Sequence, residues 1–138
     1  MTSQPPLSLP RQGSCQCGAV TYVLNAQPLG LWTCHCTECQ RQTGSAFGMS
    51  MLVPSAGLRF TGVEPARWYR RAESGRRVEA LFCARCGSRI AHRHEGRDDV
   101  TTLKPGTLLD TSGLAPLSHH FRDTAQPWID ALLPRDAS

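Results

Sequence analysis

Short runs in which apolar and polar residues alternate recur along the chain from Gly13 onward, and turn-forming residues separate them. Alternation with a period of two is typical of strands that bury one face. The separating turns are rich in Gly, Pro and Ser, as in the segment 54–57 and the segment 73–75. The pattern predicts strands at residues 20–24, 47–53, 58–60, 67–69, 78–82, 89–92 and 100–103.

Little helix is expected. Thr37 can cap a single helical turn over residues 37–41, and one amphipathic turn over residues 128–133 ends at Pro134. The composition agrees, because 12 Gly and 10 Pro with only 7% aromatic residues suit short strands joined by many turns. We therefore predict a mainly β fold.

The length of 138 residues predicts one domain. Residues 1–12 are rich in Pro, Ser and Gln, which predicts a flexible N-terminal arm. The predicted domain spans residues 13–133, and residues 134–138 are predicted to form a tail. No apolar run approaches the roughly 20 residues that span a bilayer, and the N-terminus lacks the apolar stretch of a signal peptide. We expect a cytoplasmic protein without a membrane partner.

Seven cysteines carry the strongest chemical signal, and they fall into three tight groups: Cys15 and Cys17; Cys34, Cys36 and Cys39; Cys83 and Cys86. Both C-x-C and C-x-x-C spacings present two sulfurs to one ion at about 2.3 Å. The odd count and the close spacings argue against a disulfide framework. Sulfur-rich sites favour zinc, with an iron–sulfur cluster as the alternative. Gly18 and Gly87 each follow a group, where a knuckle often needs a positive φ.

The charge supports this interpretation and limits the partners. The 15 Lys and Arg against 11 Asp and Glu give a net charge of +4 with neutral thiols. Seven thiolates and two divalent ions lower that net charge of +4 to about +1. A nearly neutral protein is a poor candidate for charge-driven binding of nucleic acid.

The number of sulfurs also bears on function, because a structural zinc site has four protein ligands and a catalytic one has three. Seven divides into four and three. Chain order favours a closed site from the first and third groups, with the middle group left as a three-sulfur site. In the alternative, a histidine or a carboxylate completes the second site and both are structural. His35 lies between two ligands and should point elsewhere.

The sequence around these cysteines resembles the glutathione-dependent formaldehyde-activating enzyme family, which includes centromere protein V. The similar stretches are residues 13–22, CHCTECQRQTGSAFG at 34–48, and residues 82–88, 103–108 and 126–129. The resemblance implies a β-tent fold with two zinc ions. It also implies carbon–sulfur lyase activity, with glutathione or a similar thiol and a small aldehyde such as formaldehyde as partners. The implied structural zinc ligands are Cys15, Cys17, Cys83 and Cys86, and the implied catalytic zinc ligands are Cys34, Cys36 and Cys39.

On this hypothesis, a substrate thiol occupies the fourth position of the second zinc ion and attacks an aldehyde carbon as the thiolate. Other polar residues are weaker candidates with ordinary alternatives. Thr43 and Ser45 could donate to an oxyanion or simply form a turn, and His92 and His94 could move a proton, complete the second site or lie at the surface. The arginines of the 70–77 hairpin could bind the carboxylates of glutathione or remain solvated: Arg70, Arg71, Arg76 and Arg77.

Two other functions stay open. A non-catalytic double-zinc module could bind protein or nucleic acid through the basic stretch 67–77, which contains Trp68 and Tyr69. The middle cysteine group could instead cycle between dithiol and disulfide. His119 and His120 are expected only at a strand edge.

Overall fold

The computed structural model describes residues 4–116 and 118–133. The predicted tail at 134–138 lies outside the described residues. The strands are β1 (Arg11–Ser14), β2 (Thr21–Leu24), β3 (Gly30–Cys34), β4 (Gly48–Pro54), β5 (Leu58–Phe60), β6 (Ala66–Arg71), β7 (Arg77–Phe82), β8 (Arg89–His94), β9 (Val100–Leu103) and β10 (His119–His120). All seven predicted strands are present, within two residues of their predicted ends.

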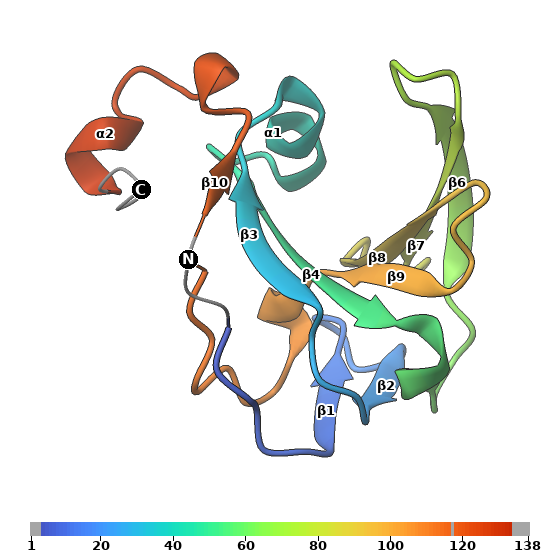
Figure 1. The fold of residues 1–138 in the computed structure, drawn as a ribbon. Helices are drawn as coiled ribbons and strands as arrows, with labels where there is room; N and C mark the ends of the chain where they lie inside the picture. The colour runs from blue at the N-terminus through green and yellow to red at the C-terminus, as the bar shows by residue number, and fades with distance from the viewer. Residues whose placement is uncertain (1–3, 117, 134–138) are drawn as a thin grey trace.

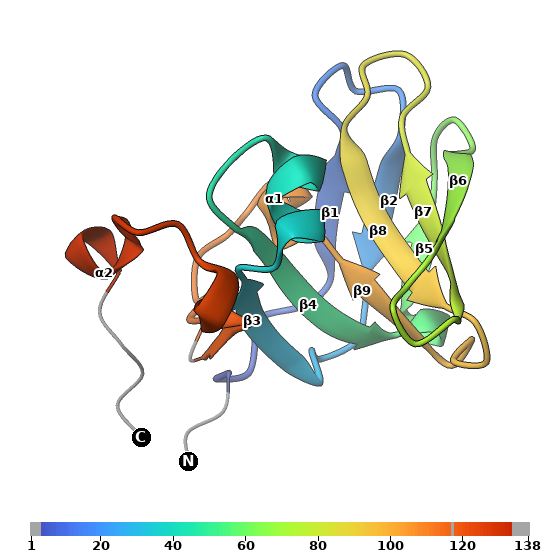
Figure 2. The same cartoon turned by 90° about the horizontal axis from the view of Figure 1, so that it is seen from above.

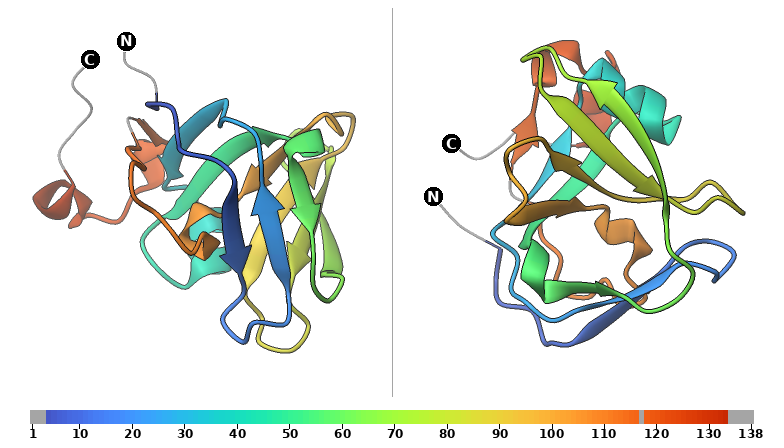
Figure 3. Two further views of the ribbon diagram at one scale, coloured as in Figure 1. Left: turned by 90° about the horizontal axis from the view of Figure 1, so that it is seen from below. Right: turned by 90° about the vertical axis from the view of Figure 1, so that its right-hand side faces the viewer.

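The strands form two sheets (Figure 1). The small sheet has the order β1-β2-β5, and the large sheet has the order β10-β3-β4-β9-β8-β7-β6. Every pairing is antiparallel except that between β10 and β3. Figure 3 shows the small sheet facing the large one. This arrangement confirms the mainly β, β-tent fold with little helix.

The core lies between the two sheets. Tyr22 and Leu24 of β2 pack with Met51, Leu81 and Leu103 of the large sheet, and each is at most 1% exposed. The Tyr22 hydroxyl reaches the Thr107 hydroxyl at 2.7 Å, so the one polar atom of this buried ring has a partner. The alternating apolar positions of the sequence are therefore the positions that the sheets bury.

The packed part of the chain extends upstream of the predicted domain start at Gly13. Leu7 is 5% exposed and exchanges two backbone hydrogen bonds of 2.8 Å with the side-chain amide of Gln27. Arg11 begins β1 and is 6% exposed, because its guanidinium donates to the carbonyls of Ser8, Asp110 and Ser112. These contacts hold the segment predicted as a flexible arm against the domain.

Helices are short and lie outside the sheets. They are α1 (Thr37–Thr43), α2 (Ile129–Leu132) and the 3₁₀ turns η1 (Ser55–Gly57), η2 (Pro105–Thr107) and η3 (Arg122–Thr124). Figure 2 shows α1 beside β4 at one end of the large sheet. Among the described residues, no helix is long and apolar enough to cross a membrane.

Candidate metal centres

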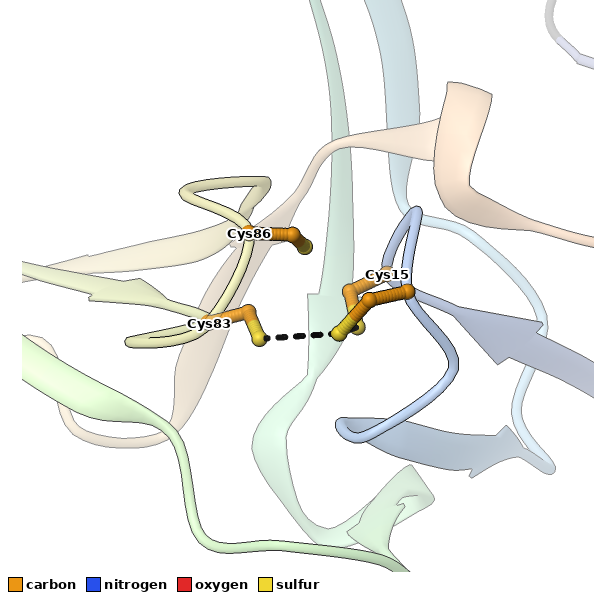
Figure 4. A group of neighbouring side chains, drawn as sticks. Cys15, Cys83 and Cys86 are labelled. Atoms are coloured by element: carbon orange, nitrogen blue, oxygen red, sulfur yellow. Dashed lines mark hydrogen bonds between the residues drawn. The ribbon is translucent and has the colours of Figure 1, made fainter.

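Four cysteines from two turns that are distant in the sequence form one candidate metal site, which we call the first cysteine group. Cys15 and Cys17 lie in the turn between β1 and β2, and Cys83 and Cys86 lie in the turn between β7 and β8. All four sulfur atoms lie within 4.8 Å of one another. Figure 4 shows Cys83 and Cys86 on one turn with their side chains directed towards Cys15 on the other. The group therefore links the small sheet to the large one.

Backbone geometry holds both turns in place. Gly18 has a φ of 85° and its N–H donates to the Cys15 carbonyl at 3.2 Å. Gly87 has a φ of 82° and its N–H donates to the Cys83 carbonyl at 2.8 Å. The predicted positive φ at both glycines is confirmed. A side chain at either position would strain the turn that directs the sulfurs inward.

The donor set fits one tetrahedral metal ion. Four sulfurs placed 2.3 Å from a central zinc ion lie about 3.8 Å apart. The Sγ atoms of Cys15 and Cys17 are 3.7 Å apart, as are those of Cys17 and Cys83. The Ser88 hydroxyl, 3.2 Å from the Cys86 sulfur, lowers the pKa of that thiol to about 5 and favours the thiolate that a metal binds.

The second cysteine group is local in sequence. Cys34 ends β3, Cys36 caps α1, and Cys39 lies in its first turn, where the Cys39 N–H donates to the Cys36 sulfur at 3.3 Å. The three sulfurs lie within 4.8 Å of one another. Among the described residues, no histidine or carboxylate joins this group. It therefore presents three protein ligands.

His35 points away from the group, as predicted. Its ring is fully buried, with Nε2 3.1 Å from the Thr33 hydroxyl and 3.3 Å from Nδ1 of His119. His119 lies in β10, the edge strand beside β3, and the His120 ring stacks on Trp32. The expectation of strand-edge positions for these two histidines is confirmed.

A buried lysine lies beside the second group, and the sequence analysis missed it. Lys104 is 8% exposed, and its ammonium donates to the Met49 carbonyl at 3.2 Å. Burial lowers the pKa of Lys104, while the nearby Cys39 and Cys34 sulfurs act in the opposite direction. The composition held a signal, because this is the only lysine in a chain with 14 arginines.

The three thiols do not ionise alike. A hydrogen bond from the Cys39 thiol, assisted by the charge of Lys104, lowers the pKa of Cys34 to about 5. The same hydrogen bond raises the pKa of Cys39. The group thus keeps a thiolate at neutral pH, and Lys104 is the nearby cation that stabilises it.

Gly48 lies between the lysine and the second group. It pairs with Cys34 across β3 and β4. A Cβ atom at this position would lie 3.3 Å from the Cβ of Cys39, 3.5 Å from Nζ of Lys104 and 3.6 Å from Sγ of Cys39. Any larger side chain would therefore occupy the space between the ammonium and the sulfur.

Polar residues continue from the second group across the large sheet. Arg70 of β6 pairs with Glu38 of α1 at 3.4 Å, and the Arg89 guanidinium lies over the Trp68 ring at 6.0 Å. A pocket of about 320 Å³ opens on this side and contains His92. Its lining residues are Trp32, Leu52, Arg76, His92, Arg93, His94, Arg97, Val100 and Thr102.

His92 is held neutral in this setting. Burial and the charge of Lys104 lower its pKa well below the usual value, and its buried Nδ1 has no hydrogen-bond partner among the described residues. Neither His92 nor His94 belongs to a cysteine group. The alternative in which one of them completes the second site is therefore not supported by the geometry. Both histidines instead line the adjacent pocket.

The remaining candidates divide between the site and the surface. Arg70 lies near the second group, and Arg76 lines the adjacent pocket. Arg71 instead donates to the Gly75 carbonyl, and Arg77 lies over the Tyr69 ring at 4.5 Å.

The turn after α1 is formed by its own hydroxyl. Thr43 donates to the Cys39 carbonyl at 3.0 Å and accepts from the Ser45 N–H at 3.2 Å, while the Ser45 residue is exposed. These bonds are ordinary turn chemistry, and they fix the end of the helix that carries Cys39.

Fold and sites together define a class: a two-sheet β domain with one group of four thiols and one group of three, each able to hold a metal ion. The particular family follows from comparison. The chain belongs to the glutathione-dependent formaldehyde-activating enzyme family, whose model matches residues 10–124. No curated protein matches the chain.

A solved structure supports the fold. The chain is similar to the crystal structure of a Rhodobacter sphaeroides protein, with a TM-score of 0.54 and 18% sequence identity. The similarity covers 76% of this chain and 91% of that chain. At this identity the likeness concerns the fold alone.

Proposed function

We propose that this protein is a zinc-dependent carbon–sulfur lyase-type enzyme that joins a thiol to a small aldehyde, or runs the reverse reaction. Glutathione or a similar thiol and formaldehyde or another small aldehyde are the proposed substrates. Family membership supports the chemistry, because the family is described as glutathione-dependent and formaldehyde-activating. In this proposal both cysteine groups hold zinc, so the protein carries two zinc ions per chain.

The unequal cysteine groups are the observation that carries the proposal. Four thiols at tetrahedral spacing can close a coordination sphere, whereas Cys34, Cys36 and Cys39 supply only three ligands. A site with three protein ligands accepts one exogenous ligand, as catalytic zinc sites do. We therefore assign the structural role to the first group and the catalytic role to the second.

Zinc bound by three thiolates would stabilise the thiolate form of a substrate thiol at neutral pH. The substrate sulfur then attacks the aldehyde carbon, a carbon–sulfur bond forms, and the carbonyl π electrons move to oxygen. The proton lost by the thiol ends on that oxygen, so the product is a hemithioacetal and no redox change occurs. Three cysteine thiolates leave the site with a net charge of −1, which keeps a bound sulfur nucleophilic and suits thiol transfer better than activation of water.

Residues around the second group suit a thiol that carries carboxylates. Arg89 lies over the Trp68 ring, and Arg70 pairs with Glu38 of α1. Glu38 is next to Cys39 in the sequence. Burial lowers the pKa of Arg89, and the Cys39 sulfur acts in the opposite direction. Guanidinium groups bind carboxylates with two parallel hydrogen bonds. We propose that Arg89 and Arg76, the latter at the adjacent pocket, bind the carboxylates of glutathione.

The test is a Cys36→Ser variant compared with wild type. The zinc content per chain is measured, and formation of the thiol–formaldehyde adduct is followed by NMR with glutathione at neutral pH. We expect two zinc ions and catalysis in wild type, and one zinc ion with the rate of adduct formation reduced to the uncatalysed value in the variant. A matched control is Ser45→Ala, an exposed position outside the cysteine groups, which should keep both. A Cys36→Ser protein with full activity would refute the assignment.

A non-catalytic double-zinc module is the second candidate. Its support is the exposed pair Trp68 and Tyr69 on the edge strand β6, beside arginines. This module predicts that added thiol leaves the metal coordination unchanged. Absorption spectra of the cobalt-substituted protein with and without glutathione therefore distinguish the two functions.

A further inference from the structure

Lys104 presents a charge problem that the fold must solve. Its side chain is 8% exposed, and its one hydrogen bond among the described residues goes to a neutral carbonyl, that of Met49. Burying a charged group is costly unless an opposite charge compensates it. Among residues 4–116 and 118–133, no carboxylate lies within 4.0 Å of the ammonium. The compensating anion has to be something other than Asp or Glu.

The second cysteine group supplies that anion. As thiolates, Cys39 and Cys34 oppose the effect of burial on the pKa of Lys104, and Cys36 acts in the same direction. Nζ of Lys104 and Sγ of Cys39 lie next to the same small space, because a Cβ atom added at Gly48 would be 3.5 Å from the nitrogen and 3.6 Å from the sulfur. No other lysine exists in the chain, and the arginines of the same face, Arg70 and Arg89, contact Glu38 and Trp68.

We propose that Lys104 is a positioning residue for the second metal site, where its ammonium balances the net negative charge of three cysteine thiolates around a divalent ion. One buried ammonium offsets the net charge of −1 of three thiolates and a divalent ion, whereas the nearby Arg89 is only half-buried and lies over the Trp68 ring. The ammonium charge then favours an incoming thiolate over a neutral ligand as the fourth partner of the ion. This second consequence rests on the proposed function, whereas the charge balance at the three-cysteine site does not.

Two substitutions separate the charge from the hydrogen bond. Lys104→Gln removes the charge but keeps an N–H donor for the Met49 carbonyl, and Lys104→Met removes both. Metal affinity at the second site is measured by competition with a chromophoric chelator in the zinc-loaded protein, with the first site as internal reference. Outer-shell partners of metal ligands typically contribute 10–100-fold to affinity, so we expect a loss of roughly that size in both variants.

The matched control is Arg93→Gln. It removes an equal charge from β8, but Arg93 contacts Thr101 at 2.9 Å and Glu79 at 3.9 Å, away from the cysteines. This variant should keep the affinity of the second site within about twofold of wild type, well below the loss expected for an outer-shell partner. An equal loss in Arg93→Gln and Lys104→Gln would mean that overall charge, not Lys104, sets the affinity.

A cobalt-substituted sample tests the thiolate preference with 2-mercaptoethanol, which carries no charge besides its sulfur. Lys104→Gln should need a higher thiol concentration than wild type for the same change in the sulfur-to-cobalt absorption band. If Lys104→Gln binds metal at the second site as tightly as wild type, the proposal is wrong. In particular, a loss of metal affinity in Lys104→Met alone would assign the effect to the hydrogen bond with Met49 and not to the charge. If wild type shows no spectral response to thiol, the proposed function fails while the metal-affinity comparison still decides the role of Lys104.

Discussion

Removing both cysteines of the turn between β7 and β8, in a Cys83→Ser/Cys86→Ser variant, should destabilise the fold far more than Cys36→Ser/Cys39→Ser. Each double variant leaves its metal group with too few ligands. Only the first group crosses the chain, because Cys17 and Cys83 are 66 residues apart. In the second group, the outermost ligands, Cys34 and Cys39, are separated by a few residues of β3 and α1.

Loop closure gives the magnitude. Treated like a disulfide cross-link, a metal bridge across about 66 residues restricts the unfolded chain by about 4 kcal/mol, and a bridge across about 5 residues by about 2 kcal/mol. The unfolded chain also retains a metal ion more readily at a local group, which cancels part of its stabilising effect. The expected difference of about 2 kcal/mol corresponds to roughly 6–12 °C in Tm for a chain of this size.

Urea unfolding followed by circular dichroism, at equal free zinc and with the metal content measured, provides the assay. Wild type and both double variants are compared, because a domain whose total stability is about 5–15 kcal/mol registers such a difference clearly. Equal destabilisation by the two double variants would refute the reasoning. A Cys83→Ser/Cys86→Ser protein as stable as wild type would do so as well.

Three further tests address packing, ionisation and metal release. Gly13→Ala should lower the free energy of unfolding by roughly 1–3 kcal/mol in thermal denaturation, because the added Cβ would overlap the Tyr22 ring. The control Gly106→Ala adds a Cβ that meets no atom within 4 Å and should leave stability unchanged. Equal effects of the two substitutions would contradict this reasoning. Burial raises the pKa of Tyr22 from 10.0 to about 12, so the folded protein keeps the phenol proton to a higher pH than the unfolded chain does. The free energy of unfolding should therefore fall as pH rises from 10 to 12. Urea unfolding at several pH values should show a weaker pH dependence for Tyr22→Phe, and an unchanged slope would contradict this. A chelator of moderate strength should remove the metal ion of Cys34, Cys36 and Cys39 before the circular dichroism changes, because we expect this group to contribute less to folding than the other. Release of both ions together with unfolding would argue against two distinct roles.

Alternation along the chain predicted seven of the ten strands and missed β1, β3 and β10, and in β1 and β3 a polar residue points inward. In β1 the buried position is Arg11, whose guanidinium is satisfied by three backbone carbonyls. In β3 the buried Thr33 lies between the buried Leu31 and Cys34, and its hydroxyl bonds to His35 and His119. A hydropathy pattern cannot identify such positions, because some of their partners, such as Asp110 and His119, come from distant parts of the sequence.

The candidate sites show the same division between local and long-range information. Spacing predicted only which neighbouring cysteines act together, because C-x-C and C-x-x-C fix nearby sulfurs before any tertiary contact forms. The joining of Cys15 and Cys17 with Cys83 and Cys86 was favoured by chain order and implied by the family resemblance. Lys104 could not be found in that way. Its place beside Cys39 depends on the pairing of β4 with β9, which brings a residue 65 positions further along the chain to the second group.

Sequence separation also agrees with the proposed division of roles between the two cysteine groups. A ligand set that closes a long loop links the two sheets, and loss of its metal ion should destabilise the fold. A ligand set made within β3 and α1 can exchange its fourth partner without moving the sheets, because Cys34, Cys36 and Cys39 are already held by one strand end and one helical turn. On the proposed function, the group that we expect to contribute less to folding is the one that binds substrate, and a buried lysine beside it would balance the charge of that site.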